Sequence, residues 1–499
     1  MPAAALTVVP GHSLGQLHLG ASLYEILTLV KGDKATYPSI NVHHSQSEPL
    51  ATPVVVGLPE NGLRLRFDGA DQRLRLIEVL DFRKAKLQHK GSDLIKSLDD
   101  SNSSSGPGFK RVYSLFGPSY PGEYIAPRDS SPRGTYVLSW AGIAFNFPLL
   151  HSAWSPEKDH VSLLGSNLAS PATQMALFEG KSWAEARRDL FVRQSTGPRM
   201  SALSTRSKDS LPAEIEHANV LGDRKIELFR LNAAGNFTIV LNQTTPQDLL
   251  TELGPPDVTH RREERDATPE QTMHKRTSST SRPRSNGRHP GSQPSSYSST
   301  GTDTFETEFE SGEMDEDSFD RSSRQKFWCY FNHGLDILVG PPIDRAPLQT
   351  EPTPRTPLTS SPHLVVLKVV VHGNVPGSYA FNRHRRLRWY ISLPGTDASG
   401  DYLSSEHHFD QEIKPILMAQ YAGVWPEAEM GRGKVINRTW GGEDSSDSGF
   451  FLPDAGQDLE DGGGSSEQWL GNTKLYSFPG LAFEVLDNGA VSALTVSSG

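Results

Sequence analysis

Two runs of β-forming residues most constrain the fold of this chain. Residues 327–331 (Phe-Trp-Cys-Tyr-Phe) and 335–339 (Leu-Asp-Ile-Leu-Val) flank the short turn Asn332-His333-Gly334, a pattern that predicts a β-hairpin. A valine-rich run follows at residues 364–371. Its β-branched side chains favour a strand that is buried on most of its surface. We found no catalytic motif in this stretch and interpret it as scaffold.

Helix signals precede hairpin signals at several points along the chain. Ser22-Leu23-Tyr24-Glu25 has the form of a capping box, and Thr245-Pro246 with Asp248 predicts the start of another helix. With similar patterns near 112–147 and 416–496, we expect four units of helix, Gly/Pro stop and hairpin. The sequence therefore predicts an α+β fold of repeated units, each a short helix followed by antiparallel β-hairpins, interrupted by long disordered insertions. Because the spacing is irregular, the repetition is weak.

The largest predicted insertion runs from Arg261 to Arg324 and is rich in Ser, Thr, Arg and Pro. Such a composition cannot bury enough apolar surface to offset the entropy lost on ordering. Shorter insertions of the same kind are expected near 346–362 and 441–466. We therefore expect residues 1–255 to form the N-terminal part of one α+β body, 256–325 a disordered linker, and 326–499 the C-terminal part of the same body.

Charge and cysteine content narrow the class of protein. A formal net charge of -10 argues against a general nucleic-acid binder. The single cysteine, Cys329, rules out an internal disulfide and fits a reducing compartment. The N-terminus lacks the basic region of a signal peptide, and no run of about 18 apolar residues is present. These features predict a cytoplasmic protein.

The candidate catalytic and metal motifs are weak. Residues 117–123 have the glycine spacing of a phosphate-binding loop, but Glu123 stands where that chemistry needs lysine. The adjacent pairs His43-His44 and His407-His408 would point to opposite faces of a strand, although the second could form a metal site in a loop. We expect no enzyme, no catalytic residue, no cofactor and no metal; a hydrolase with an unrecognised site is the remaining enzymatic alternative.

Two arginine clusters are the candidate binding surfaces for a partner or a lipid. One comprises Arg383, Arg385, Arg386 and Arg388, and the other comprises Arg64, Arg66, Arg73 and Arg75. Several cations beside Trp389 and Tyr390 would suit an anionic head group or an acidic partner. If the first cluster is extended, its arginines alternate between two faces, so at least one row should meet solvent or a partner. The alternative is a solvated strand edge.

Ordered blocks of sequence resemble the phagophore assembly factor family of eukaryotes. The blocks are residues 19–23, 62–68, 72–79, 116–122, 330–338, 368–382 and 483–485. The resemblance implies a non-enzymatic adaptor that associates with a β-propeller protein, of the WD-repeat kind, at the phagophore during autophagy. It also implies recruitment from the cytoplasm to phagophore membranes, with phosphoinositide contact left largely to the propeller. The alternative is a peripheral phosphoinositide-binding or Golgi and vesicle-trafficking module that acts without a partner.

Overall fold

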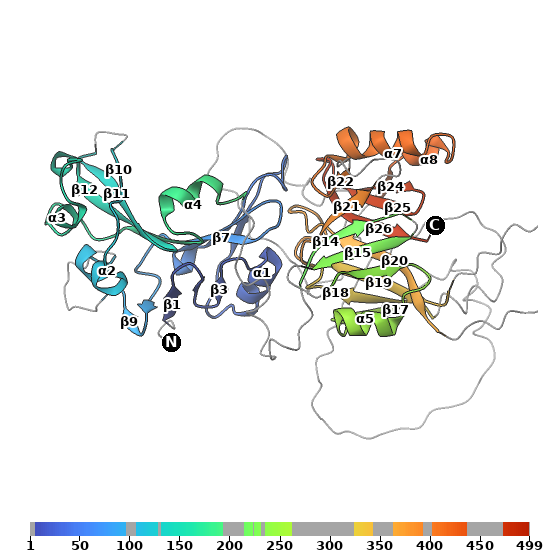
Figure 1. The fold of residues 1–499 in the computed structure, drawn as a ribbon, viewed down its shortest axis with the longest axis horizontal. Coiled ribbons are helices and arrows are strands. Elements are labelled where there is room, and N and C mark those ends of the chain that lie inside the picture. The colour runs from blue at the N-terminus through green and yellow to red at the C-terminus, as the bar shows by residue number, and fades with distance from the viewer. Residues whose placement is uncertain are drawn as a thin grey trace, which may run out of the picture.

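The computed structural model describes residues 5–95, 106–127, 131–192, 214–222, 224–230, 235–261, 324–342, 363–392, 402–436 and 473–498. The chain forms two β-rich halves that lie side by side (Figure 1). We call them the N-terminal half, from β1 to α4, and the C-terminal half, from β14 to β26. Antiparallel pairing dominates and the helices are short, which is consistent with the predicted α+β class.

The N-terminal half contains a five-stranded sheet, in the order β3-β2-β1-β8-β9, and an eight-stranded sheet, in the order β10-β11-β12-β13-β7-β6-β5-β4. The strands are β1 (Leu6–Val9), β2 (Ser13–Leu14), β3 (Leu17–His18), β4 (Asn41–His43), β5 (Val54–Leu58), β6 (Leu63–Phe67), β7 (Leu74–Val79), β8 (Leu87–His89), β9 (Ser92–Asp93), β10 (Glu123–Ile125), β11 (Arg133–Trp140), β12 (Ile143–Leu150) and β13 (Gln174–Phe178). The helices are α1 (Leu23–Gly32), α2 (Phe109–Phe116), α3 (His160–Leu164) and α4 (Trp183–Asp189), with the 3₁₀ turns η1 (Pro59–Asn61) and η2 (His151–Ala153).

The C-terminal half has the same pair of sheets, in the orders β16-β15-β14-β21-β22 and β17-β18-β19-β20-β26-β25-β24-β23. Its strands are β14 (Ile215–Val220), β15 (Lys225–Arg230), β16 (Phe237–Val240), β17 (Val258–Arg261), β18 (Lys326–Tyr330), β19 (Leu335–Gly340), β20 (Val365–His372), β21 (Arg388–Ser392), β22 (Tyr402–Ser404), β23 (Lys434–Ile436), β24 (Thr473–Phe478), β25 (Leu481–Val485) and β26 (Val491–Ser497). Its helical segments are α5 (Pro246–Leu253), the π-helical η4 (Phe409–Ile413), α7 (Lys414–Gln420) and α8 (Glu427–Gly431).

The two halves are topological repeats of each other. Replacing β1–β9 by β14–β22, and β10–β13 by β23–β26, converts the strand orders of the first half into those of the second. Even the parallel pairing of β1 with β8 recurs, as β14 with β21. The four predicted helix-hairpin units are not confirmed as the repeat. The hairpins of successive units join edge to edge, β7 with β13 and β20 with β26, so two predicted units build one eight-stranded sheet.

Each half has its own hydrophobic core. One cluster gathers buried residues between Val8 and Leu177, and another gathers those between Ile215 and Val496. The predicted helix starts are confirmed, because Ser22 accepts a hydrogen bond from the backbone of Glu25 and Thr245 forms a capping box with Asp248. Helix α1 ends at Gly32, and Asp33 occupies its C-cap position.

The predicted boundaries fall within the C-terminal half, since residue 255 lies between α5 and β17. Most of the predicted insertions at 261–324, 346–362 and 441–466 lie outside the described residues. The ends of the first are neighbours, because Arg261 pairs with Lys326 across β17 and β18. Among the described helices, none is long and apolar enough to span a membrane.

Candidate functional site

The two halves meet where two connecting segments face each other. One is the turn Asp68–Arg73 between β6 and β7, and the other is the segment 373–387 between β20 and β21. Gln72 donates from its side-chain amide to the backbone carbonyl of Asn374 at 2.8 Å, and the Asn374 amide donates back to Gln72 Oε1 at 2.8 Å. Both residues are buried and have positive φ, so each turn is shaped to present its amide to the other.

A shared glutamate joins arginines from the two halves. Glu214 stands immediately before β14, and its Oε1 accepts hydrogen bonds from Arg73 of the N-terminal half and from Arg385 of the C-terminal half. Arg385 also donates to the backbone carbonyl of Ile215. All three charged side chains are buried. Burial lowers the pKa of Arg73, while nearby carboxylates act in the opposite direction. Charges buried in this way are stable only while they remain paired.

Two further arginines reach across the junction. Arg386 donates to the carbonyl of Ala70 at 2.5 Å and to that of Gly373 at 2.7 Å. Burial lowers the pKa of Arg386 to about 10. Arg388 lies 3.0 Å from Asp71 and 2.6 Å from Glu406. Burial acts to lower the pKa of Arg388, but these two carboxylates raise it above its usual value. The segment 373–387 is therefore fastened to the N-terminal half by directed, charge-assisted contacts.

Apolar contacts accompany this polar network. Leu50 of the N-terminal half forms a small buried cluster with Val375 and Leu486 of the C-terminal half. Phe381 packs against the core of the N-terminal half. Gly334 has a φ of +71°, and a Cβ at that position would lie 2.4 Å from the carbonyl oxygen of Arg385. A glycine is thus required where segment 373–387 passes the β18–β19 turn.

The structure places the predicted 383–388 cluster mostly inside the molecule. Arg385 and Arg386 are 4% exposed, so these two members of the candidate binding surface are buried and have a structural role. Successive side chains alternate between the two faces of the sheet only from Arg388, where β21 begins. The residues before Arg388 are not part of a strand. Arg383 is exposed and lies over the ring of Tyr379. Binding of a partner or lipid by any of them stays a prediction.

The second predicted cluster divides in a similar way. Arg64 and Arg66 both pair with Glu78 across adjacent strands, at 2.6 and 2.9 Å. About a third of each of these two arginine side chains is exposed, at 35% and 34%. Arg75 is buried and pairs with Asp68 at 2.6 Å. With Arg73 at the junction, the structure brings Arg73 and Arg75 together with Arg385, Arg386 and Arg388, and leaves Arg64 and Arg66 on the sheet.

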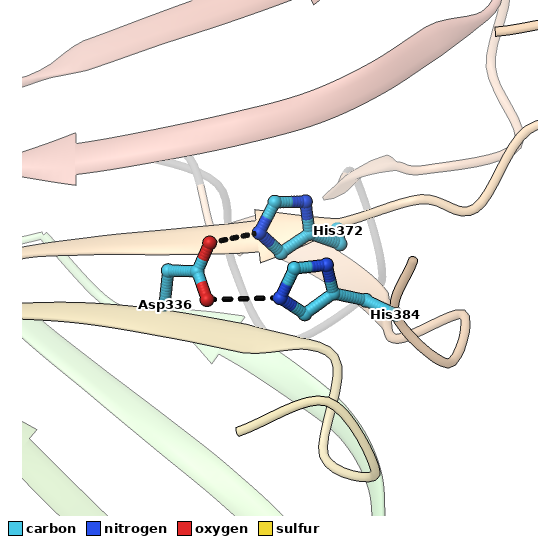
Figure 2. Close-up of side chains that lie close together, drawn as sticks. All are labelled: Asp336, His372 and His384. Atoms are coloured by element: carbon cyan, nitrogen blue, oxygen red, sulfur yellow. Dashed lines mark hydrogen bonds and ion pairs between the residues drawn. The ribbon is translucent and has the colours of Figure 1, made fainter. Parts of the chain in front are cut away.

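Next to the junction, Asp336, His372 and His384 form a cluster (Figure 2). Asp336 Oδ2 lies 2.9 Å from His372 Nε2, and Oδ1 lies 2.9 Å from His384 Nε2. The two imidazole rings stack with their centroids 3.8 Å apart and their planes 9° apart. Burial alone would raise the pKa of Asp336, but the two histidines hold it well below its usual range. Burial, together with His372, lowers the pKa of His384 to about 4.

Backbone pairing explains how these residues meet. Asp336 in β19 lies opposite Val370 in β20, and His372 follows two residues later on the same face. The amide of Leu387 donates to the carbonyl of His372, and the amide of Arg385 donates to Phe331. These bonds hold His384 against the end of the sheet. The cluster therefore connects the sheet of the C-terminal half to the segment that carries Arg385 and Arg386 into the junction.

No sequence motif predicts this cluster. The adjacent pairs His43-His44 and His407-His408 lie elsewhere: His43 ends β4, His407 accepts from the backbone of Ser404, and His408 caps η4. One signal was available, since Asp336 is a lone carboxylate inside an apolar strand, where an unpaired charge is costly. Cys329 lies opposite Asp336 on the neighbouring strand and is buried. Burial raises the pKa of the Cys329 thiol, and the nearby charge of Asp336 raises it further.

Comparison with known proteins gives one family. The family model described as phagosome assembly factor 1 matches residues 13–285 and 313–497. A PHAF1 protein of Arabidopsis thaliana is 23% identical over 99% of this chain and 93% of its own length. A PHAF1 protein of Drosophila melanogaster is 28% identical over 36% of this chain and 40% of its own length. No solved structure matches the chain.

Proposed function

Because this chain belongs to the phagosome assembly factor 1 family, we propose that it is a non-enzymatic adaptor in the assembly of phagosomal or autophagic membranes. The family match extends over both halves, as the resemblance of the sequence blocks predicts. The observation that carries the adaptor role is the junction, where Glu214 binds one arginine from each half. Such a buried network fixes two bodies in one orientation, which suits a platform that holds partners in a set geometry.

We further propose that the partner is a β-propeller protein and that the pair is recruited from the cytoplasm to the phagophore. What supports this is the resemblance of the blocks at 62–68, 72–79, 330–338 and 368–382, together with the structural role of residues in them. The blocks include Gln72 and Asn374, which meet at the junction. A surface shared by the two halves would be lost if they separated, so partner capture should require an intact junction.

The test compares the wild-type chain with a junction variant. Glu214→Gln removes the charge that Arg73 and Arg385 share while keeping the side chain's shape. The matched control is Glu123→Gln, which breaks the exposed pair with Arg187. Each chain is expressed in starved cells, and recruitment to phagophore puncta is measured along with co-purification of a β-propeller protein. We expect Glu214→Gln to reduce both and Glu123→Gln to reduce neither.

Membrane binding without a partner is measured separately, by flotation of the purified full chain with phosphoinositide-containing vesicles. We expect the chain to remain unbound unless a β-propeller protein is added. Flotation of the chain alone would favour the peripheral lipid-binding module instead of the adaptor. Normal recruitment of a Glu214→Gln variant whose two halves have been shown to separate would overturn the platform role.

A further inference from the structure

We propose that Asp336, His372 and His384 form a binding site for one divalent metal ion, and that zinc suits the donor atoms best. One ligating atom from each side chain lies within 4.8 Å of the other two. Both Nε2 atoms face the same carboxylate (Figure 2). Two imidazole nitrogens with a carboxylate are a donor set that zinc accepts readily, whereas calcium and magnesium prefer oxygen alone.

The site is built from three separate segments and is buried. Asp336 lies within β19, His372 ends β20, and His384 lies in the segment before β21. Asp336 is 6% exposed and His384 is 7% exposed. A carboxylate this far from water must be paired or must coordinate a metal ion. The groups that face it are two imidazoles and, across the strand, the thiol side chain of Cys329. A bound dication would replace the two imidazole hydrogen bonds as the partner of the carboxylate.

The arrangement offers three protein ligands to one ion, namely two imidazole nitrogens and one carboxylate. Three protein ligands leave the fourth position of a tetrahedral zinc ion to a water molecule. The rings now stack nearly parallel, so each must turn about its Cβ–Cγ bond for the Nε2 atoms to converge on the ion. Nδ1 of His384 has no hydrogen-bond partner among the described atoms. Nε2 is therefore the only polar attachment seen for that ring, and no bond through Nδ1 would resist the turn.

The ion would cross-link β19, the end of β20 and the segment that follows. That segment donates through Arg386 to Ala70 and through Arg385 to Glu214. Metal binding would thus stiffen the part of the C-terminal half that touches the N-terminal half. The inference does not rest on the proposed function, because metal binding is measured on the purified chain alone.

The experiment uses the full-length chain, stripped of metal with a chelator and then titrated with Zn²⁺ by calorimetry. We expect one equivalent of Zn²⁺ to bind and the melting temperature to rise with Zn²⁺ concentration, because an ion that binds only the folded state stabilises it. Co²⁺ bound in place of Zn²⁺ should give the visible absorption of a four-coordinate ion. Element analysis of the dialysed complex checks the stoichiometry.

Variants decide whether the ion is at this site. Loss of an outer partner of a metal ligand typically weakens binding about 10- to 100-fold, so loss of a ligand itself in His372→Gln should weaken it by at least about 100-fold. His372 is the more exposed of the two histidines, and its replacement is the variant expected to fold. The control is the double change His407→Gln and His408→Gln, which removes the adjacent pair of histidines near η4 and should leave the affinity unchanged.

Two results would overturn the proposal. If the folded wild-type chain takes up no Zn²⁺ and its melting temperature does not respond to the ion, the cluster is a hydrogen-bonded triad only. If His372→Gln and Asp336→Asn bind Zn²⁺ as tightly as the wild type, the ion is held elsewhere. If Asp336→Asn fails to fold, the Zn²⁺ affinity of His372→Gln, compared with that of the His407/His408 control, still shows whether the ion binds at this cluster.

Discussion

Two arginine pairs, one from each candidate cluster, have similar sequences but different environments. Arg64 and Arg66 lie two residues apart on β6, and Arg386 lies two residues before Arg388, the first residue of β21. The first pair extends over an open face of the sheet and shares Glu78, with about a third of each side chain exposed. The second pair contacts the other half of the molecule, Arg386 at Ala70 and Arg388 at Asp71. Arg386 is 4% exposed and donates to backbone carbonyls on both sides of the junction.

The difference teaches that the charge pattern does not decide whether an arginine is surface or structure. What decides it is the path of the chain. The backbone amides of residues 385 and 387 donate to the carbonyls of Phe331 and His372, and the segment so held places Arg385 at Glu214 and Arg386 at Ala70. The energetic consequences also differ: exposed ion pairs contribute about 0–1 kcal/mol, whereas breaking a buried pair costs about 3–5 kcal/mol because the remaining charge is left unpaired.

The largest effect should come from reversing a buried charge. Arg385→Glu places a second carboxylate beside Glu214, where Arg73 alone remains to pair with both. We expect the free energy of unfolding to fall by about 3–5 kcal/mol, measured by urea denaturation. The matched control is Arg187→Glu, since Arg187 also pairs with a glutamate but is 44% exposed. A loss below about 1 kcal/mol in Arg385→Glu would show that the junction is weaker than its geometry indicates.

Much of the local structure could be predicted from sequence. The hairpin at 327–339, the valine-rich strand and the caps at Ser22 and Thr245 depend on residues close together in the chain, and the structure contains each of them. The pairing of β7 with β13 and of β20 with β26 joins strands far apart in sequence. No local pattern encodes such a pairing, so the predicted four-unit repeat missed the twofold one.

The candidate site was harder to predict for the same reason. Gln72 meets Asn374 across 302 positions, and Asp336 meets His384 across 48. Each residue is unremarkable among its own neighbours, and its partner is defined only after the sheets have formed. The rule that strand residues alternate between faces failed at 383–387 because that segment is not a strand. Arg64 and Arg66 follow the rule because β6 is regular through both.

Acid should sharpen the contrast between buried and exposed groups. His333 is buried in the β18–β19 turn, and burial, helped by the nearby Arg230 charge, lowers its pKa to about 4. In the unfolded chain the imidazole of residue 333 binds a proton below about pH 6.5, whereas in the folded chain it stays neutral down to about pH 4. Its contribution to the free energy of unfolding is therefore complete above pH 6.5 and is lost as the pH falls towards 4. We expect His333→Gln to remove up to about 3 kcal/mol of this pH dependence.

The measurement is urea denaturation of wild type and His333→Gln between pH 7.5 and 4.5. His43→Gln serves as the control, because His43 is exposed on the edge strand β4. The slope of stability against pH should flatten in His333→Gln and remain as in wild type in His43→Gln. Equal slopes in all three chains would mean that His333 is protonated in the folded state or that its turn opens to water.

A smaller effect is expected on the open sheet. Replacing both Arg64 and Arg66 by Ala leaves Glu78 without either partner, but Glu78 keeps contact with solvent at 17% exposure. We expect a loss of about 1 kcal/mol or less, and less still at high salt, because screening weakens partly exposed pairs. Thermal unfolding at low and high ionic strength measures it. A loss as large as that of Arg385→Glu would remove the distinction between the arginines of the open sheet and those of the junction.

The smallest effect on stability should come from Arg383, which is exposed in the otherwise buried cluster. Its guanidinium lies 4.5 Å from the ring centre of Tyr379, and an exposed cation–π contact contributes about 0.5–1 kcal/mol at most. We expect Arg383→Glu to melt within a degree or two of wild type.

If the cluster does bind an acidic partner or lipid, this variant should nonetheless weaken partner capture, since Arg383 can make that contact without leaving the junction. The control is Arg187→Glu, which makes the same charge reversal at another exposed arginine, far from this segment in sequence. This control should leave capture intact. Unchanged capture by Arg383→Glu would mean that the arginines of this segment serve only to join the two halves.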